Sequence, residues 1–113
     1  MDDSTIFDRI LSREASADIV FEDQDVLAFR DIRPQAPVHV LVIPKRRAAS
    51  LEELNGREAE AGRFMSGIIR VVRKLGLPEG YRVVVNSGRH GQQSVDYLHA
   101  HILGGRQMSW PPG

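Results

Sequence analysis

The 113-residue sequence contains no cysteine, which excludes disulfide bonds, thiolate metal sites and cysteine nucleophiles. Its 15 basic side chains only balance its 15 acidic ones, so we expect no general binding to nucleic acid, which needs clustered lysine and arginine. No apolar run approaches the ~20 residues of a membrane span. The acidic start from Met1 to Asp3 is also unlike a targeting segment. We therefore expect one soluble domain over residues 1–113, with no membrane partner, in the cytoplasm and also in the nucleus if the source is eukaryotic.

The zero net charge hides an asymmetry along the chain. Residues 1–31 hold nine acidic and three basic side chains, whereas residues 32–113 hold six acidic and twelve basic ones. Because opposite charges attract, small anionic ligands should favour the second part of the chain.

Hydrophobic periodicity predicts two helices and five strands. A short amphipathic helix is expected over 5–12 with Ser4 as its cap, and a long one after a cap at Asn55, ending at Gly76. The apolar stripe expected on the long helix consists of Ala61, Met65, Ile68, Ile69, Val72 and Leu75. Strands are expected over 19–22, 26–29, 38–43, 81–85 and 94–103. These elements indicate an α+β domain with a mainly antiparallel sheet.

Three histidines lie within the predicted strands. Side chains alternate along a strand, so His99 and His101 should project from one face, roughly 6.6 to 6.8 Å apart. His39 occupies a similar place in the strand over 38–43. A polar imidazole among apolar, β-branched neighbours requires an explanation. His90 lies in a glycine-containing turn and is expected to be exposed and without a role.

Three interpretations of this pattern stay open from the residues alone. Each imidazole could be a core side chain satisfied by a backbone carbonyl, or the pair at i and i+2 could act on one small group. A His-x-His pair with a third histidine elsewhere also suits a catalytic zinc site. The lack of an obvious carboxylate nearby in the sequence speaks against a metal.

Several motifs in order resemble the histidine triad (HIT) superfamily, in which histidine alternates with hydrophobic residues. Ser94–Met108 carries the alternating signature, and Asp31–Lys45 and Trp110–Gly113 are similar to the nucleotide-binding Hint branch in particular. The resemblance covers nearly the whole chain. It implies a five-stranded sheet per subunit with one long and one short helix, joined into a ten-stranded sheet in a homodimer.

The resemblance also implies an activity, the hydrolysis of purine nucleoside phosphoramidates such as AMP-lysine without a metal or other cofactor. His99 matches the nucleophile, which becomes transiently adenylylated before water releases AMP. His101 and His39 match residues that face the phosphate oxygens, so three of the four histidines would converge on one phosphate. Ser94 matches the hydroxyl that helps the leaving amine depart, and Asn86 a further phosphate-side contact.

Nucleoside binding and dimer formation are implied in the same way. Asp31 matches the carboxylate that accepts the ribose hydroxyls, although it could simply be a turn residue. The resemblance places four apolar side chains around the purine, and any of them could instead be core: Phe7, Ile10, Phe29 and Ile32. Trp110 matches a tail residue directed towards the partner subunit's active site.

The sequence departs from the family pattern at two positions. Tyr97 occupies the first triad position in place of histidine. Since the family uses the backbone carbonyl there to hold the nucleophile, we expect the chemistry to survive this change. Gln92 stands where relatives commonly have glycine, and it should crowd the phosphate loop or weaken a backbone contact there.

Three rival functions follow from these departures and alternatives. A non-catalytic nucleotide-binding or adaptor protein would bind purine nucleotide without forming an adenylyl-enzyme. A dinucleoside polyphosphate hydrolase of the Fhit branch would lack the Hint-like tail from Gly104 to Gly113. A histidine-based metal site would retain its ion through purification.

Overall fold

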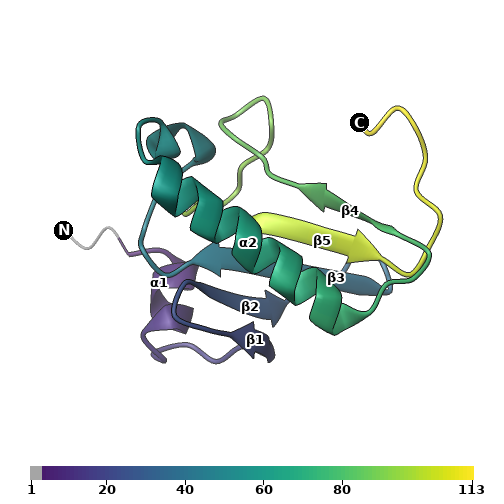
Figure 1. Cartoon of the computed structure of the whole chain (residues 1–113), viewed down its shortest axis with the longest axis horizontal. Coiled ribbons are helices and arrows are strands. Elements are labelled where there is room, and N and C mark those ends of the chain that lie inside the picture. The colour runs from purple at the N-terminus through teal and green to yellow at the C-terminus, as the bar shows by residue number, and fades with distance from the viewer. Residues whose placement is uncertain (1–3) are drawn as a thin grey trace.

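The computed structural model describes residues 4–113, so the acidic start from Met1 to Asp3 lies outside the described residues. The secondary-structure elements along the chain are α1 (Ile6–Leu11), β1 (Ile19–Glu22), β2 (Val26–Arg30), β3 (Val38–Pro44), a 3₁₀ helix η1 (Leu51–Leu54), α2 (Glu58–Leu75), β4 (Tyr81–Val84) and β5 (Ala100–Gly104). Figure 1 shows the long helix α2 lying across the sheet. Within residues 4–113, no helix combines the length and apolarity that crossing a membrane requires.

The strands form one five-stranded sheet in the order β1-β2-β3-β5-β4, and every pairing is antiparallel. This architecture confirms the α+β fold expected from the sequence. The central strand β3 and its neighbour β5 carry His39 and His101, with Leu41 opposite His101 and Leu103 opposite His39. The two histidines therefore sit diagonally on one face at the middle of the sheet.

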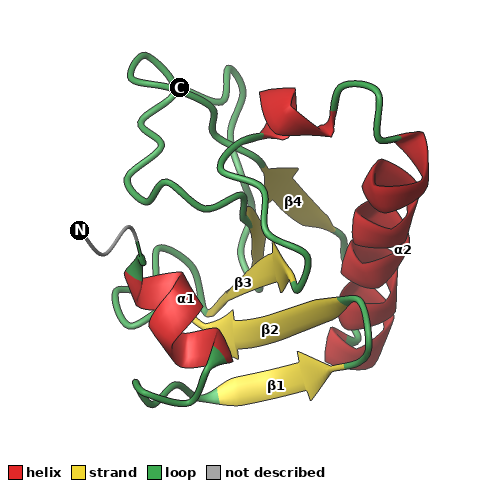
Figure 2. Cartoon of the chain, turned by 90° about the vertical axis from the view of Figure 1, so that its left-hand side faces the viewer, coloured by secondary structure: helices red, strands yellow, loops and turns green. Residues whose placement is uncertain are grey.

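Side-chain alternation along β3 divides the core into two layers. Val40 and Val42 pack against α2 on one face, in a cluster that includes Phe64 and Ile68. Leu41 and Ile43 point to the other face, where the second cluster contains Phe7, Ile10, Leu27, Phe29 and Tyr97. Figure 2 shows α1 and α2 on opposite sides of the sheet. The histidines share the α1 face.

The cap of α1 is one residue later than predicted. Thr5, rather than Ser4, is the N-cap: its hydroxyl accepts hydrogen bonds from the backbone N–H groups of Phe7 and Asp8. The Asp8 carboxylate in turn accepts from the Thr5 backbone N–H at 2.6 Å. This reciprocal capping box satisfies the exposed donors at the start of the helix.

The beginning of α2 was also predicted wrongly. Asn55 ends the 3₁₀ helix η1, which the sequence pattern did not reveal, and α2 starts at Glu58 with Arg57 at the cap. Gly76 ends the helix as predicted, in the left-handed conformation with a φ of 63°.

The apolar stripe predicted for α2 is confirmed in part. Ile68 is buried, and Ala61, Val72 and Leu75 pack against the core as predicted. The buried residues are Phe64, Gly67, Ile68 and Val71, whereas Met65 and Ile69 are 57% and 50% exposed. At Gly67 the helix approaches β2 so closely that a Cβ atom would lie 2.9 Å from Val26 Cγ2. The missing side chain therefore brings this face of the helix, and not its neighbour, onto the sheet.

The last strand is shorter than predicted, beginning at Ala100 instead of Ser94. The backbone just before it bonds to the segment after β3 and not to a neighbouring strand. The Leu98 N–H donates to the Ala48 carbonyl at 2.7 Å, and Arg47 donates to the Asp96 carbonyl at 3.2 Å. Apolar alternation alone could not distinguish this packed loop from a strand.

Candidate active site

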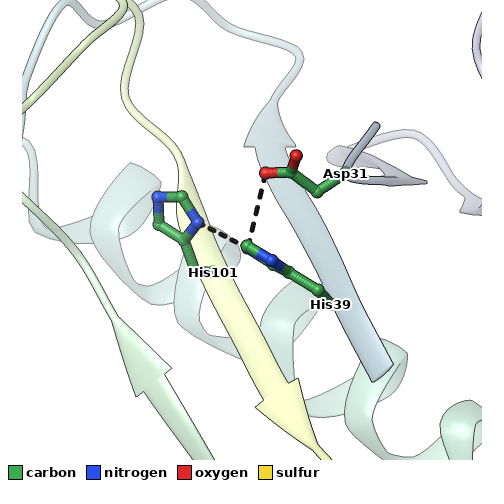
Figure 3. Close-up of side chains that lie close together, drawn as sticks. All are labelled: Asp31, His39 and His101. Carbon is green, nitrogen blue, oxygen red and sulfur yellow. Dashed lines mark hydrogen bonds and ion pairs between the residues drawn. The ribbon is translucent and has the colours of Figure 1, made fainter. Parts of the chain in front are cut away.

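Three imidazoles meet on the α1 face of the sheet, as the family resemblance implied. The ring centroids of His99 and His101 are 5.0 Å apart, and those of His39 and His101 are 5.2 Å apart. His39 and His99 are buried, and His101 is half-buried. His90 is exposed, as expected. Figure 3 shows His39 between His101 and the carboxylate of Asp31.

The hydrogen bonds of His39 fix the position of its proton. Its Nδ1 accepts from the backbone N–H of Gln35 at 3.0 Å, so in the neutral ring the proton is on Nε2. That Nε2 lies 2.9 Å from His101 Nδ1 and 3.4 Å from an oxygen of Asp31. His101 therefore accepts at Nδ1, and its own proton is on Nε2, which is free to donate to a ligand.

His99 has the opposite tautomer. Its Nδ1 lies 2.7 Å from the backbone carbonyl of Tyr97, which can only accept, so Nδ1 carries the proton. In the neutral ring the lone pair is then on Nε2. The ring of Phe7 packs edge-on against the imidazole with centroids 5.0 Å apart, which limits its rotation. An oriented, neutral imidazole with a free lone pair is suited to nucleophilic attack.

Burial keeps the other two rings neutral near pH 7. It lowers the pKa of His101 to about 4, with further lowering by the neighbouring His99 and His39 and opposition from Asp31. Burial likewise lowers the pKa of His39, although the Asp31 carboxylate acts in the other direction. A neutral His39 can keep its proton on Nε2 and donate it to His101 Nδ1.

The pKa of His101 predicts a loss of stability in mild acid. In the unfolded chain His101 binds a proton below its ordinary pKa of 6.5. In the folded chain it binds that proton only below about pH 4. Stability is therefore lost as the pH falls through this window. Between pH 7 and pH 4.5 we expect wild type to lose about 2 kcal/mol more unfolding free energy than His101→Gln, after allowance for solvent screening. Urea unfolding at both pH values measures the difference, and equal losses would contradict the assignment.

Asp31 is a turn residue, one of the two roles that the sequence left open, and it also faces the histidines. One oxygen accepts from the Arg33 backbone N–H at 2.8 Å, as in a local turn, while the other faces His39. The structure thus supplies the carboxylate beside the histidines that the sequence did not reveal. The proposed contact of Asp31 with ribose stays a prediction.

The four apolar residues predicted around the purine do not share one environment. Phe7, Ile10 and Phe29 are buried in the core cluster on the histidine face. Ile32 is 92% exposed on the loop that follows Asp31. The Phe7 ring packs edge-on against the imidazole of His99.

The remaining predicted residues lie in loops. Ser94 is exposed and Asn86 is half-buried, and neither forms a hydrogen bond to the three imidazoles within residues 4–113. Asn86 lines a cavity of about 450 Å³ beneath the C-terminal tail. Trp110, in that tail, is 81% exposed. Its predicted contact with a partner subunit stays a prediction.

Gln92 affects the backbone and does not crowd the loop. Its side chain is exposed, but its φ is 59°, in the left-handed region that favours glycine. The neighbouring Gly91 has no room for a side chain, because a Cβ atom there would lie 2.8 Å from the Ser87 carbonyl oxygen. The departure at Gln92 therefore adds local strain without blocking the loop.

A metal ion does not suit this cluster, although ligand atoms of Asp31, His39 and His101 lie within 4.8 Å of one another. A cation bound to His39 Nε2 would require the proton to move to Nδ1. That nitrogen would then point its N–H at the N–H of Gln35, 3.0 Å away, and their hydrogen bond would be lost. We therefore assign no metal to this site.

Sequence reasoning missed the residues that hold the histidines in place. Gln35 acts through its backbone N–H, which has no side-chain signature. Gln93 donates to the carbonyls of Ala49 and Val95 and accepts from the Gly88 N–H, and so fixes the loop before His99. The basic run after β3 was the only available signal for Arg47, which contacts Asp8 and the Tyr97 ring.

Known proteins resemble this chain in both sequence and fold. The profile of the HIT domain matches residues 12–108. The chain is 50% identical to the adenylylsulfatase HINT1 of Arabidopsis thaliana over 99% of its length and 78% of that protein. It is also 50% identical to a 14 kDa zinc-binding protein of Zea mays over all of its length and 91% of the relative.

A solved structure agrees with these sequence matches. The crystal structure of a HIT family hydrolase from Legionella pneumophila aligns with a TM-score of 0.90 and 44% identity. The alignment covers 97% of this chain and 100% of that one. With its three converging imidazoles, the chain belongs to the histidine triad (HIT) family, as its motifs predicted.

Proposed function

We propose that this protein hydrolyses purine nucleoside 5′-phosphoramidates through a nucleotidyl-His99 intermediate, releasing AMP or GMP. The observation that supports this most directly is the 2.7 Å contact between His99 Nδ1 and the Tyr97 carbonyl. It leaves the Nε2 lone pair available without any prior deprotonation. The similarity to the HIT family hydrolase of Legionella pneumophila supports a hydrolytic reaction in general.

The proposed reaction has two displacements at phosphorus. In the first, His99 Nε2 attacks the α-phosphorus, the P–N bond to the amine breaks, and the amine leaves with a proton from the Ser94 hydroxyl. In the second, water attacks the same phosphorus and returns one proton to the Ser94 oxygen, the bond to His99 breaks, and the nucleotide departs. His101 Nε2–H donates to a phosphoryl oxygen in both steps, where developing charge makes a fixed donor most effective.

Nucleoside recognition is proposed for the α1 end of the site. Asp31 would accept the ribose hydroxyls with a carboxylate already directed toward His39. Phe7, Ile10 and Phe29 would form the base of the purine pocket, and the exposed Ile32 would cover it from the loop. Asn86 would contact the phosphate from the opposite side.

The name of the Arabidopsis relative supports a second substrate, adenylyl sulfate. Attack by His99 on the same phosphorus would here break the bond to sulfate instead of the bond to an amine. Sulfate is a good leaving group and needs no proton. Comparing Ser94→Ala on both substrates separates the reactions, since only the phosphoramidate should depend on the hydroxyl.

Hydrolysis of a fluorogenic adenosine 5′-phosphoramidate in excess EDTA tests the proposal. We expect sustained turnover by wild type, unchanged by removal of divalent ions, because the site needs no metal. Elemental analysis of the purified protein should find no stoichiometric zinc, despite the name of the maize relative. Activity that EDTA abolishes and zinc restores would contradict the metal-free mechanism. Nucleotide binding without turnover would favour the adaptor alternative.

A homodimer is proposed from the unpaired edge of the sheet. β4 is an edge strand with Tyr81 and Val83 exposed, and Met65 and Ile69 are exposed on α2. Pairing of β4 with its copy would give a ten-stranded sheet and cover these side chains. It would also direct Trp110 of the tail toward the neighbouring site.

Light scattering after gel filtration tests this assembly. We expect a dimer at micromolar concentration, because an uncovered edge strand and apolar helix face are costly in water. Ile69→Lys should shift the protein to a monomer, whereas Ile19→Lys, on the opposite sheet edge, should not. A monomeric wild type would contradict the proposal.

A further inference from the structure

Arg47 joins three parts of the molecule that are far apart in the sequence. It follows β3, and its Nε lies 3.0 Å from Asp8 Oδ1 in α1. Its Nη2 donates to the Asp96 carbonyl at 3.2 Å, and its guanidinium carbon lies 5.4 Å from the centroid of the Tyr97 ring. One side chain thus contacts both the short helix and the loop that leads to His99.

The Tyr97 end of this contact controls the orientation of the predicted nucleophile. The Tyr97 carbonyl accepts the Nδ1–H of His99, and the N–H of the same peptide group, on Leu98, donates to Ala48 at 2.7 Å. The Tyr97 phenol donates to the Pro44 carbonyl at 2.6 Å, and its ring is fully buried. Arg47 holds the preceding peptide group through the Asp96 carbonyl, so the peptides on both sides of Tyr97 are fixed.

The Asp8 end fixes the ring that packs on the nucleophile. Asp8 uses one oxygen for Arg47 and the other for the Thr5 backbone N–H, which sets the start of α1. Phe7, the preceding residue, contacts both His99 and Tyr97 edge-on. Burial acts to raise the pKa of Asp8, but hydrogen bonds from Thr5 and Arg47 outweigh it and lower the pKa below its usual value. The hydrogen bond to Asp8 raises the pKa of Arg47 in turn.

We propose that Arg47 is a positioning residue that holds the Tyr97 peptide and α1 together and so orients the imidazole of His99. This inference rests on the proposed function and deepens it, because it assigns the placement of the nucleophile to a side chain outside the triad. Tyr97 contributes through its ring as well as its carbonyl, since the ring is the surface on which Arg47 lies. The departure from histidine at this position thus has a structural role.

The test compares two adjacent arginines in the full-length protein. Arg47→Ala should lower kcat on the adenosine phosphoramidate about 10- to 100-fold with little change in KM, because small misplacements of a reacting group are costly. Arg46→Ala is the matched control: its side chain is 75% exposed and pairs with Glu60 on α2, so its kcat should equal that of wild type. Arg47→Lys, which can keep the ion pair with Asp8 but not the guanidinium fork, should give an intermediate kcat.

A second readout does not depend on the activity. In protein labelled with ¹⁵N-histidine, wild type should show a slowly exchanging Nδ1–H signal for His99 and an unprotonated Nε2. Arg47→Ala should lose the protection of that signal while circular dichroism shows a folded protein, and Arg46→Ala should retain it. If wild type has no turnover, the proposed function fails, but this signal still tests Arg47. Unchanged kcat and an unchanged Nδ1–H signal in Arg47→Ala would overturn the inference.

Discussion

His99→Ala is expected to reduce hydrolysis of an adenosine 5′-phosphoramidate at least about 10³-fold, because the variant has no atom that can form the covalent intermediate. The substitution removes a buried imidazole whose Nδ1–H donates to the Tyr97 carbonyl. The binding of AMP should persist, since the residues proposed for the nucleoside and the phosphate oxygens stay in place. Steady-state rates and calorimetric titration with AMP measure the two effects separately.

His90→Ala is the matched control for this substitution. His90 is a histidine of the same chain, nine positions earlier, but it is exposed and outside the cluster. Its removal should leave the turnover rate within a factor of about two, as expected for a surface change with no partner in the site. Full turnover by His99→Ala would refute the proposed mechanism. Equal losses in both variants would indicate damage to the fold.

Gly67→Ala is expected to have the largest effect on stability, a loss of about 2 to 3 kcal/mol of unfolding free energy. A new Cβ atom would overlap Val26 Cγ1 and lie 3.2 Å from Val26 Cβ, which cannot move without shifting β2. The gain in helix propensity, about 1 kcal/mol, opposes this cost but does not cancel it. Urea unfolding monitored by circular dichroism measures the change.

Gly62 in the same helix provides the control. A Cβ atom there meets nothing within 4 Å, so Gly62→Ala should stabilise the protein by up to about 1 kcal/mol. Opposite signs at two glycines of one helix would show that close packing, and not helix propensity, decides the effect at Gly67. Adding Val26→Ala to Gly67→Ala should recover part of the loss. A stabilised Gly67→Ala would contradict the observed approach of α2 to β2.

The strands of the sheet could be predicted from the sequence because alternation is a strong local signal. Along β3 the valines at even positions pack under α2, and Leu41 and Ile43 pack on the α1 face with His39. The same alternation predicted that His99 and His101 share a face, and their rings do meet. Alternation relates residues two positions apart, so the sequence pattern is enough to predict which face of the sheet a side chain occupies.

Features that depend on distant partners could not be predicted in this way. The loop over 94–98 has a strand-like pattern, but its backbone bonds to residues 47–49. The burial of Phe64 instead of Met65 follows from the close approach at Gly67. The tautomer of His39 depends on the backbone N–H of Gln35, which any residue except proline would supply. These are tertiary contacts between residues far apart in the chain, and they produce no local sequence pattern.

The central claim is that His99 attacks through Nε2 and carries the nucleotide. Mass spectrometry and peptide mapping test it most directly. The wild-type reaction is stopped during turnover without acid, because acid cleaves the bond between phosphorus and imidazole. We expect one nucleoside monophosphate per chain on the peptide that contains both His99 and His101, assigned to His99 by fragmentation, and none in His99→Ala. Rapid turnover with an unmodified His99, or with the adduct on His101 or His39, would contradict the claim.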